Sequence, residues 1–398
     1  RIIIFDRSVR ISTHDPAALY FDDFLKLGEG LPRQSEVEKL YQEANDSDLC
    51  NILYTSGTTG DPKGVMLTYG QYSAALKAND EVVPISEKDR IIEFLPITHI
   101  FERGWSYLAF SEGAHIIINT YPHEIQQSMR ETHPTSMSSV PRFWEKVYQA
   151  VKDKIDRSSL MQQKLFRHAL EIGRKYNLEC KSRCKRPSPM LAMEYKVFDK
   201  MVLRLVRKQL GLENANIFPT AGAAVSPEVE RFAHSVGLNM VAGYGLTESL
   251  ATVSCDRENM PYTIGSVGRP INGLDVKIGD NDEILLKGPT ITHGYYRRDA
   301  ANKEAFTEDG YFRTGDAGYI KNGELFLTDR IKDLFKTSNG KYIAPQMIES
   351  LLLVDKFIDQ VVVIANERKF VSALIVPEFR LVEEWAKDHG VTADSREA

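Results

Sequence analysis

The chain has 398 residues, with 50 Lys and Arg against 55 Asp and Glu, a formal net charge of −5, and 42% hydrophobic residues. This composition is that of an ordinary globular protein and excludes an intrinsically disordered chain, a collagen-like repeat and a disulfide scaffold. No nucleic-acid partner is expected, because the overall charge does not attract a phosphate backbone.

Apolar runs of strand length alternate with helical patterns along most of the chain, which predicts an α/β fold with several layers. Loops follow the expected strands and are the expected ligand sites, because open α/β sheets bind ligands outside the carboxyl ends of their strands. The strands are expected at residues 51–54, 91–95, 114–119, 136–140 and 217–220.

The segment 148–211 is helical in composition. In its second half, Phe198, Met201, Val202 and Leu205 recur at i, i+3, i+4 and i+7, the spacing of an apolar helix face. Basic residues recur every fourth position on the opposite face, at Lys196, Lys200 and Arg204, and Arg207 and Lys208 join them. This basic face is interpreted as solvated surface or, alternatively, as a peripheral contact with anionic lipid at a membrane surface.

After Gly265 short strands and turn signals predict a small β-rich unit, and a charged run from Asp329 to Asp333 interrupts the pattern. We expect the boundary between a large and a small C-terminal domain at about Asp329. The chain starts at Arg1 and ends in an unfinished α/β pattern. It is therefore interpreted as an internal piece of a longer protein, with an incomplete C-terminal domain.

Four cysteines are present, and their spacing fits neither a zinc site nor a disulfide framework. A reducing, cytoplasmic location is the expectation. No apolar stretch approaches the roughly 18 residues that cross a bilayer. The sequence leaves the oligomeric state open, a homodimer included.

The most informative segment is YTSGTTGDPKG, from Tyr54 to Gly64. Its glycines let the backbone amides point inward, its hydroxyls add donors and its lysine adds a positive charge, which together predict a polyphosphate cradle. It is not a Walker A loop, because Lys63 lies between Pro62 and Gly64. The predicted phosphate-binding residues are Thr55, Ser56, Gly57, Thr58, Thr59, Gly60 and Lys63.

This string resembles the signature of the AMP-forming adenylate-forming superfamily, which includes acyl-CoA synthetases. GYGLTE, from Gly243 to Glu248, resembles the family's second motif. The resemblance implies that Tyr244 packs on adenine beside Gly245, that Thr247 bonds the α-phosphate, and that Glu248, with Thr55, holds Mg²⁺. A carboxylate suits this hard cation.

Two further motifs follow in the family's order, and a third segment lies before them. YFRTGD resembles the motif whose aspartate, Asp316, accepts hydrogen bonds from the ribose hydroxyls, and DRIK resembles the hinge motif. The resemblance implies that Arg330 also reaches the ribose and that Asp329 and Lys332 form the pivot. It thus implies a hinge at 329–332 between a large domain over 1–328 and a small mobile α+β C-terminal domain over 333–398. AGAA, which contains Gly222, Ala223 and Ala224, matches the segment lining the adenine and acyl pocket.

The segment from Leu95 to Arg103, the helical insert and DRIKDLFKTSNGKYIAP look like long-chain fatty-acid CoA ligases. The resemblance places His99, Val140 and Gly243 at the acyl site and Lys336 on the face used for thioester formation. It implies that ATP activates a fatty acid to an acyl adenylate with release of pyrophosphate, and that coenzyme A then takes the acyl group. The predicted catalytic residues are Lys63, Thr247, Glu248 and Lys336.

The family's later lysine motif, which serves adenylation, does not occur before Ala398. Two alternatives therefore stay open. One is a fatty acyl-AMP ligase that loads a carrier protein, and the other is a non-catalytic nucleotide-binding homologue.

Overall fold

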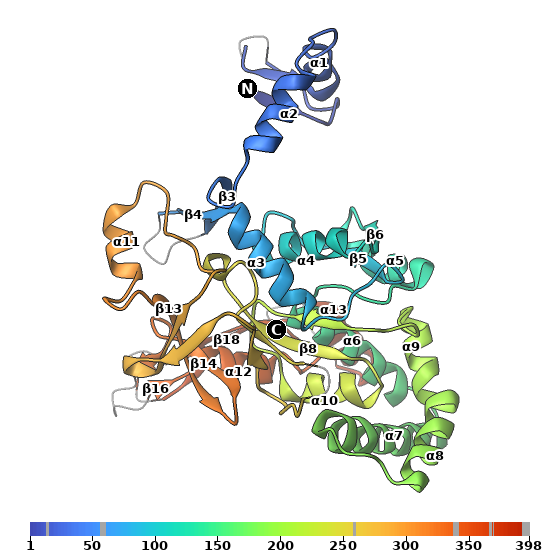
Figure 1. Ribbon diagram of the computed structural model, residues 1–398. Helices are drawn as coiled ribbons and strands as arrows, with labels where there is room; N and C mark the ends of the chain where they lie inside the picture. Colours follow the sequence, from blue (N-terminus) through green and yellow to red (C-terminus); the bar gives the residue numbers. More distant parts are fainter. Residues whose placement is uncertain are drawn as a thin grey trace. The chain divides into compact units, whose positions relative to one another are not determined.

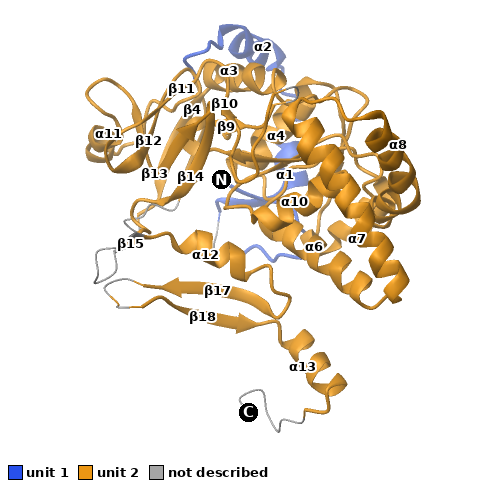
Figure 2. Cartoon of the chain, turned by 90° about the horizontal axis from the view of Figure 1, so that it is seen from below, with its two compact units in different colours: residues 1–48 blue, residues 49–398 orange. Residues whose placement is uncertain are grey.

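The protein is described from a computed structural model, which covers residues 1–12, 16–55, 61–257, 260–336, 342–365, 368 and 370–391, with Lys336 and Tyr342 described by backbone alone. It divides into two compact units, residues 1–48 and 49–398 (Figure 2). Unit 1 contains a parallel strand pair, with Ile2 opposite Ala18, followed by two helices. Its elements are β1 (Ile2–Ile4), β2 (Ala18–Tyr20), α1 (Phe21–Lys26) and α2 (Gln34–Glu43).

The central sheet of unit 2 combines parallel strands with an antiparallel edge. β5 and β6 are parallel, as are β7 and β8, and single bridges through Ser136 and Ser139 join the two pairs. β9 and β10 continue the sheet in antiparallel fashion. The strands are β5 (Arg90–Glu93), β6 (His115–Ile118), β7 (Phe218–Thr220), β8 (Met240–Tyr244), β9 (Ser254–Cys255) and β10 (Arg269–Pro270).

The two faces of this sheet bury different cores, because successive side chains of a strand point to opposite sides. Ile91 packs in a cluster with α3, α4 and the second sheet, whereas its neighbour Ile92 packs in a cluster with α6 and α10. Met240 and Val241 divide in the same way. This double coverage makes the unit a layered α/β structure, as predicted.

Figure 1 shows where the helices of unit 2 lie along the chain. Proline and hydroxyl caps start several of them. Thr68 and Gln71 form a capping box at α3, Ser159 and Gln162 form one at α7, and Pro141 opens α6. The helices are α3 (Tyr69–Asp80), α4 (Ile100–Ser111), α5 (Ile125–Thr132), α6 (Pro141–Asp156), α7 (Leu160–Arg174), α8 (Pro189–Phe198), α9 (Arg204–Leu210), α10 (Pro227–Ser235) and α11 (Asp299–Ala305).

The remaining strands form an antiparallel second sheet, a hairpin that carries the phosphate-loop segment, and the C-terminal elements. Short 3-10 turns are η1 (Pro122–Glu124), η3 (Lys181–Arg183), η5 (Thr247–Ser249) and η6 (Asp280–Asp282). The second sheet is β11 (Asp275–Ile278), β12 (Glu283–Lys287), β13 (Phe312–Lys321) and β14 (Glu324–Arg330), and the hairpin is β3 (Leu49–Thr55) with β4 (Lys63–Thr68). The C-terminal elements are β15 (Phe335–Lys336), β16 (Tyr342–Ile343), α12 (Pro345–Leu352), β17 (Ile358–Ile364), β18 (Ser372–Pro377) and α13 (Phe379–Asp388).

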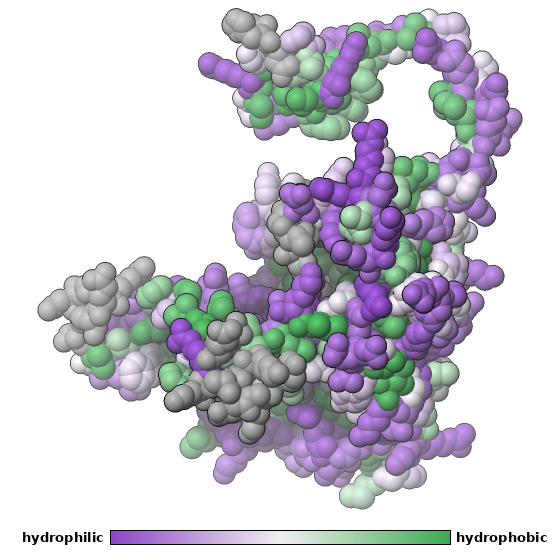
Figure 3. Space-filling model, turned by 90° about the vertical axis from the view of Figure 1, so that its left-hand side faces the viewer, coloured by the Kyte–Doolittle hydropathy of each residue, from purple (hydrophilic) through white to green (hydrophobic). Residues whose placement is uncertain are grey.

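The C-terminal elements contact α6 through polar groups. The Arg142 guanidinium donates to the Asp359 carbonyl at 2.8 Å, and the Lys356 ammonium lies 3.2 Å from the Asp153 carboxylate. Apolar side chains such as Val362 and Leu374 stay exposed on β17 and β18. Figure 3 shows hydrophobic and hydrophilic patches side by side on one face of unit 2.

The structure corrects two local expectations. Residues 136–140 form single bridges rather than a strand of their own. The apolar face expected on residues 198–205 is also wrong in part, since Met201 and Leu205 are 55% and 52% exposed whereas Leu203 is fully buried. The cause is a π-helical turn, η4 (Asp199–Leu203), which changes the register between α8 and α9. A second π-helical turn, η2 (Lys175–Cys180), follows α7.

This register predicts unequal effects for two neighbouring leucines. Leu203→Ala should lower the free energy of unfolding by about 2–5 kcal/mol, because it leaves a cavity in a packed site. Leu205→Ala, at an exposed position of the same segment, should change it by about 0.5 kcal/mol or less. Urea unfolding of the two variants measures the difference. Equal losses of unfolding free energy in the two variants would contradict the π-helical register and favour a regular helix.

Candidate functional site

Residues predicted to bind adenosine meet at the carboxyl end of β8, from β8, β13 and β14. Tyr244 is buried, and its hydroxyl donates to the Asp316 carboxylate at 2.6 Å. The Nε of Arg330 lies 3.7 Å from the other carboxylate oxygen of Asp316. Burial raises the pKa of the Asp316 carboxyl, against the opposing effects of the Tyr244 hydrogen bond and Arg330. The structure thus brings Tyr244, Asp316 and Arg330 into one cluster.

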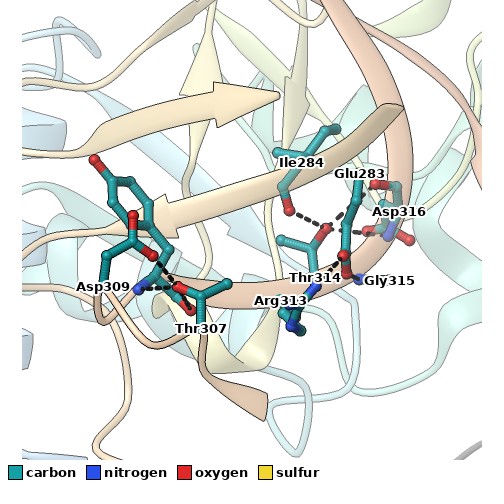
Figure 4. A network of polar contacts seen from close by, with 9 residues as sticks. Glu283, Ile284, Thr307, Asp309, Arg313, Thr314, Gly315 and Asp316 are labelled. Carbon is teal, nitrogen blue, oxygen red and sulfur yellow. Dashed lines mark hydrogen bonds and ion pairs between the residues drawn. The ribbon is translucent and has the colours of Figure 1, made fainter. Parts of the chain in front are cut away.

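The segment of β13 before Asp316 is held by a polar network with β12 (Figure 4). The Glu283 carboxylate accepts the Gly315 amide at 3.1 Å and pairs with Arg313 at 3.0 Å. The Thr314 hydroxyl donates to the Ile284 carbonyl at 2.7 Å and accepts the Asp316 amide at 3.0 Å. These bonds orient the Asp316 carboxylate towards Tyr244 without any contribution from a ligand.

Glu248 and Lys63 meet at one residue that the motifs did not include. The Tyr295 hydroxyl donates to the Glu248 carboxylate at 2.9 Å, and the Lys63 ammonium lies 5.0 Å from the centre of the Tyr295 ring. Burial and the neighbouring Glu248 charge raise the pKa of the Tyr295 hydroxyl, which therefore stays a donor. Tyr295 lies outside the recognised strings, so only its aromatic character in a turn could have drawn attention to it.

Backbone bonds connect the same parts. Tyr295 bridges to Val65 of β4, and the Thr292 amide donates to the Glu248 carbonyl at 2.7 Å. The Thr292 hydroxyl donates to the Met66 carbonyl at 2.7 Å. The strand that returns from the phosphate-loop segment is therefore fixed beside the second motif.

Other predicted phosphate-binding residues lie around the phosphate-loop segment and η5. The Thr55 hydroxyl donates to the Lys63 carbonyl at 3.4 Å at the neck of the phosphate-loop segment. Ser56, Gly57, Thr58, Thr59 and Gly60 lie outside the described residues. Thr247 is half-buried in η5 beside Glu248.

A Cβ at Gly245 would lie 1.3 Å from the Ala251 carbonyl oxygen. Only glycine fits this position, because the two backbone segments approach so closely. Gly222, with φ +93, and the exposed Ala223 and Ala224 follow β7 at the same end of the sheet.

The predicted hinge residues lie where β14 ends. The Asp329 carboxylate accepts the Arg330 amide at 2.7 Å and the Gln346 amide of α12 at 3.2 Å, so it connects β14 to the C-terminal elements. Lys332 is exposed. The Lys336 backbone pairs with Tyr342 in the β15–β16 ladder.

An apolar pocket opens beside Tyr244 and encloses about 730 Å³, its open mouth included. Gly243 lines it, as predicted for an acyl-binding residue. His99 is exposed and is absent from this lining, and Val140 lies near Gly222 instead. Other lining residues come from α3, α4 and β8, among them Tyr72, Phe101, Trp105, Leu108 and Val241.

Glu102, on the buried side of α4, fixes this helix against the end of β5. Its carboxylate accepts the Phe94 and Leu95 amides at 2.9 and 3.2 Å, and the Ser138 hydroxyl also donates to it. Burial is the main cause that raises its pKa to about 7, with the Ser138 bond acting against the shift. Glu102 therefore positions a wall of the pocket.

The comparisons with known proteins follow this geometry. A family model described as "AMP-binding enzyme" matches residues 8–296. The chain belongs to this family. The resemblance to the AMP-forming adenylate-forming family is thereby confirmed.

Relatives of this AMP-binding enzyme carry acyl-ligase names. It is 31% identical to long chain acyl-CoA synthetase 3 of Arabidopsis thaliana, over 98% of this chain and 59% of that one. It is 32% identical to the long-chain-fatty-acid–CoA ligase FadD15 of Mycobacterium bovis, over 87% of this chain and 57% of the relative. A chloroplastic long-chain-fatty-acid–[acyl-carrier-protein] ligase, AEE15 of Arabidopsis thaliana, is 28% identical over 84% of this chain and 52% of that one. The chain thus spans less than two thirds of each relative.

A solved structure shares the fold. O-succinylbenzoate coenzyme A synthetase from Bacillus subtilis, in complex with ATP and magnesium ion, superposes with a TM-score of 0.60 at 21% identity, over 88% of this chain and 65% of that one. The α/β fold of the adenylate-forming enzymes is therefore confirmed for this chain.

The buried Glu102 predicts a pH dependence of stability. Its pKa is raised from 4.5 to about 7 in the folded state, so the native protein holds this proton more firmly than the unfolded chain does. The resulting stability is complete below about pH 4.5 and is lost as the pH rises through about 7, a change of about 3 kcal/mol.

Glu102→Gln, which cannot ionise, should abolish this part of the pH dependence. The measurement is the free energy of unfolding of wild type and variant between pH 4.5 and 8. The exposed Glu87→Gln serves as the control and should follow the wild type. Parallel curves for wild type and Glu102→Gln would show that the carboxyl titrates as it does in the unfolded chain.

Proposed function

We propose that this chain is the nucleotide- and acyl-binding part of a long-chain fatty-acid CoA ligase. The supporting observation is the double role of Tyr244. It donates to Asp316 in the cluster of Tyr244, Asp316 and Arg330, called here the adenosine cluster, and it also lines the apolar pocket. An acyl group in this pocket would meet the nucleotide at one side chain. Each methylene buried there contributes about 0.8 kcal/mol, so a pocket of this kind favours long acids over short ones.

The proposed reaction has two steps. The fatty carboxylate attacks the α-phosphorus of ATP, the bond to the β-phosphate breaks, and pyrophosphate leaves an acyl adenylate. The coenzyme A thiol then attacks the acyl carbon, loses its proton to solvent, and displaces AMP to give the thioester.

The residues of the chain support the first step electrostatically. Lys63 offsets negative charge on the phosphates, and the half-buried Glu248 offers a carboxylate to Mg²⁺. Among the described residues, no group of three or more His, Cys, Asp or Glu side chains could hold a metal alone. One carboxylate together with phosphate oxygens fits Mg²⁺, which keeps few protein ligands and neutralises phosphate charge when bound.

The acceptor of the acyl group has a second candidate. The relative AEE15 is named as an acyl-carrier-protein ligase, which supports transfer to a carrier protein in place of coenzyme A. The non-catalytic alternative predicts nucleotide binding without turnover.

The test is pyrophosphate release by the full-length gene product with ATP and Mg²⁺, with hexadecanoate or acetate, each with and without coenzyme A. Turnover of hexadecanoate that yields thioester only with coenzyme A is expected. Pyrophosphate without thioester would indicate the carrier-protein ligase, preference for acetate would exclude the long-chain assignment, and inactivity with both acids would favour the non-catalytic homologue.

Glu248→Gln should lower this rate by about 10²–10³, because it removes a group that stabilises charge in the transition state. The exposed Glu304→Gln on α11 is the matched control and should retain the wild-type rate. Near-normal activity in purified Glu248→Gln would contradict the metal assignment.

We further propose a cytoplasmic protein that contacts the inner face of the membrane through α8 to α9. Met190 and Met193 are each 72% exposed there, and Met201 is 55% exposed, beside the exposed basic Lys196, Lys200 and Arg204. Apolar side chains flanked by basic ones suit a surface of anionic lipid. The four free cysteines agree with a reducing compartment. Among the described residues, no helix has the length and apolar content to cross a bilayer.

Lys196→Glu with Lys200→Glu should therefore lower binding to phosphatidylserine-containing vesicles at least about 10-fold, since each basic residue near the surface contributes about 1 kcal/mol. Co-sedimentation of the full-length protein measures this, with Lys303→Glu and Lys321→Glu as controls of equal charge change. Equal losses in both pairs would point to net charge rather than to this face.

A further inference from the structure

Tyr295 lies between the two charged groups that the proposed function assigns to ATP and Mg²⁺. Its hydroxyl donates to one carboxylate oxygen of Glu248 at 2.9 Å, and its ring centre lies 5.0 Å from the Lys63 ammonium. In the part of the chain that the structure describes, Lys63 and Glu248 form no ion pair with each other. Both charges therefore stay available to a ligand.

The bond from Tyr295 occupies only one oxygen of the Glu248 carboxylate. Among the described residues, no hydrogen bond or ion pair reaches its second oxygen, and the side chain is half-buried. The Thr292 amide, three residues before Tyr295, holds the Glu248 carbonyl at 2.7 Å. A partner that bonds a metal-ligating carboxylate fixes the orientation of that ligand. One turn thus holds both the backbone and the side chain of Glu248.

Tyr295 is itself held in one place. It is 6% exposed and packs in the core cluster that includes α3, α4 and the second sheet. The side-chain amide of Asn302, on α11, brackets its backbone: the oxygen accepts the Tyr295 amide at 2.7 Å, and the nitrogen donates to the Tyr295 carbonyl at 3.0 Å. A Cβ at Gly294 would lie 2.7 Å from the same Asn302 oxygen, so this close approach needs glycine.

We propose that Tyr295 is a positioning residue for the Mg²⁺ ligand Glu248, and that Asn302 braces it for this role. The inference rests on the proposed function, in which Glu248 offers its carboxylate to Mg²⁺. The Tyr295 hydroxyl holds one oxygen of Glu248 and leaves the other for the cation. The Tyr295 ring contacts the Lys63 ammonium and leaves its charge for the phosphates.

The test measures ATP binding by the full-length protein, with and without Mg²⁺, by isothermal titration calorimetry without any acid, so that no turnover occurs. Tyr295→Phe removes the hydroxyl and keeps the ring beside Lys63. The ATP affinity without Mg²⁺ should therefore stay unchanged. The Mg²⁺ concentration that gives half of the gain in affinity should rise about 10-fold or more, because loss of a partner of a metal-ligating group lowers metal affinity by about 10–100-fold.

Tyr148→Phe is the matched control. The buried Tyr148 hydroxyl also donates to a carboxylate, that of Glu228 on α10, and Tyr148 packs in the opposite core. This variant loses a bond of the same kind and should keep the wild-type Mg²⁺ dependence.

The outcomes separate this inference from the proposed function. An unchanged Mg²⁺ dependence in folded Tyr295→Phe would overturn the inference and leave the proposed function intact. Equal weakening of ATP binding with and without Mg²⁺ would overturn it too, since a merely structural role predicts that result. A wild-type protein that does not bind ATP would overturn the proposed function.

A double variant tests whether Tyr295 acts through Glu248. In a Glu248→Gln background, Tyr295→Phe should change the Mg²⁺ dependence little further, because the group that it positions is already lost. A full additional loss in the double variant would contradict the proposal.

Asn302→Ala keeps the Tyr295 hydroxyl and removes its brace, so it tests the arrangement even where Tyr295→Phe does not fold. The Mg²⁺ requirement should rise in the same direction by a smaller factor. An unchanged requirement would exclude Asn302 from this role.

Discussion

The hydrogen bond from Tyr244 to Asp316 is the constraint on which the site depends. It joins β8 of the central sheet to β13 of the second sheet, with both side chains buried. A buried carboxylate is costly unless it is hydrogen-bonded, so this pair favours one arrangement of the two sheets. In that arrangement the adenosine cluster and the second motif lie at one edge.

The phosphate-loop hairpin joins this edge through Thr292 and Tyr295. The Thr292 hydroxyl donates to the Met66 carbonyl and Tyr295 bridges to Val65, so both hold β4, while the Tyr295 hydroxyl donates to Glu248. The uncharged Tyr295 side chain therefore contacts both charged groups and fixes the positions of Lys63 and Glu248. Preorganised groups of this kind need no rearrangement when charge develops on a ligand.

Polarity changes along β8. Beside Tyr244 the pocket is apolar, whereas a second pocket, beyond Val241, has a polar lining. His234 is buried there and Arg257 half-buried, and the Nε2 of His234 and the Nε of Arg257 have no hydrogen-bond partner among the described residues. Side chains alternate along a strand, so Val241 lines both pockets whereas its neighbour Met240 packs in the core on the opposite face of the sheet. Strand β8 thus contributes to the Tyr244–Asp316 pair and to the linings of both pockets.

The sequence alone determined the α/β class, the order of strands and loops, and the motif residues that include Tyr244, Asp316, Glu248 and Lys63, because these depend on local pattern and short spacing. Tertiary structure decided the roles of Tyr295 and Glu102, since their partners lie on other elements and no local pattern encodes such contacts. It also decided which leucine of residues 198–205 is buried. There a π-helical turn interrupts the regular α-helical period. Tertiary packing selects this turn, and the spacing of apolar residues in the sequence does not reveal it.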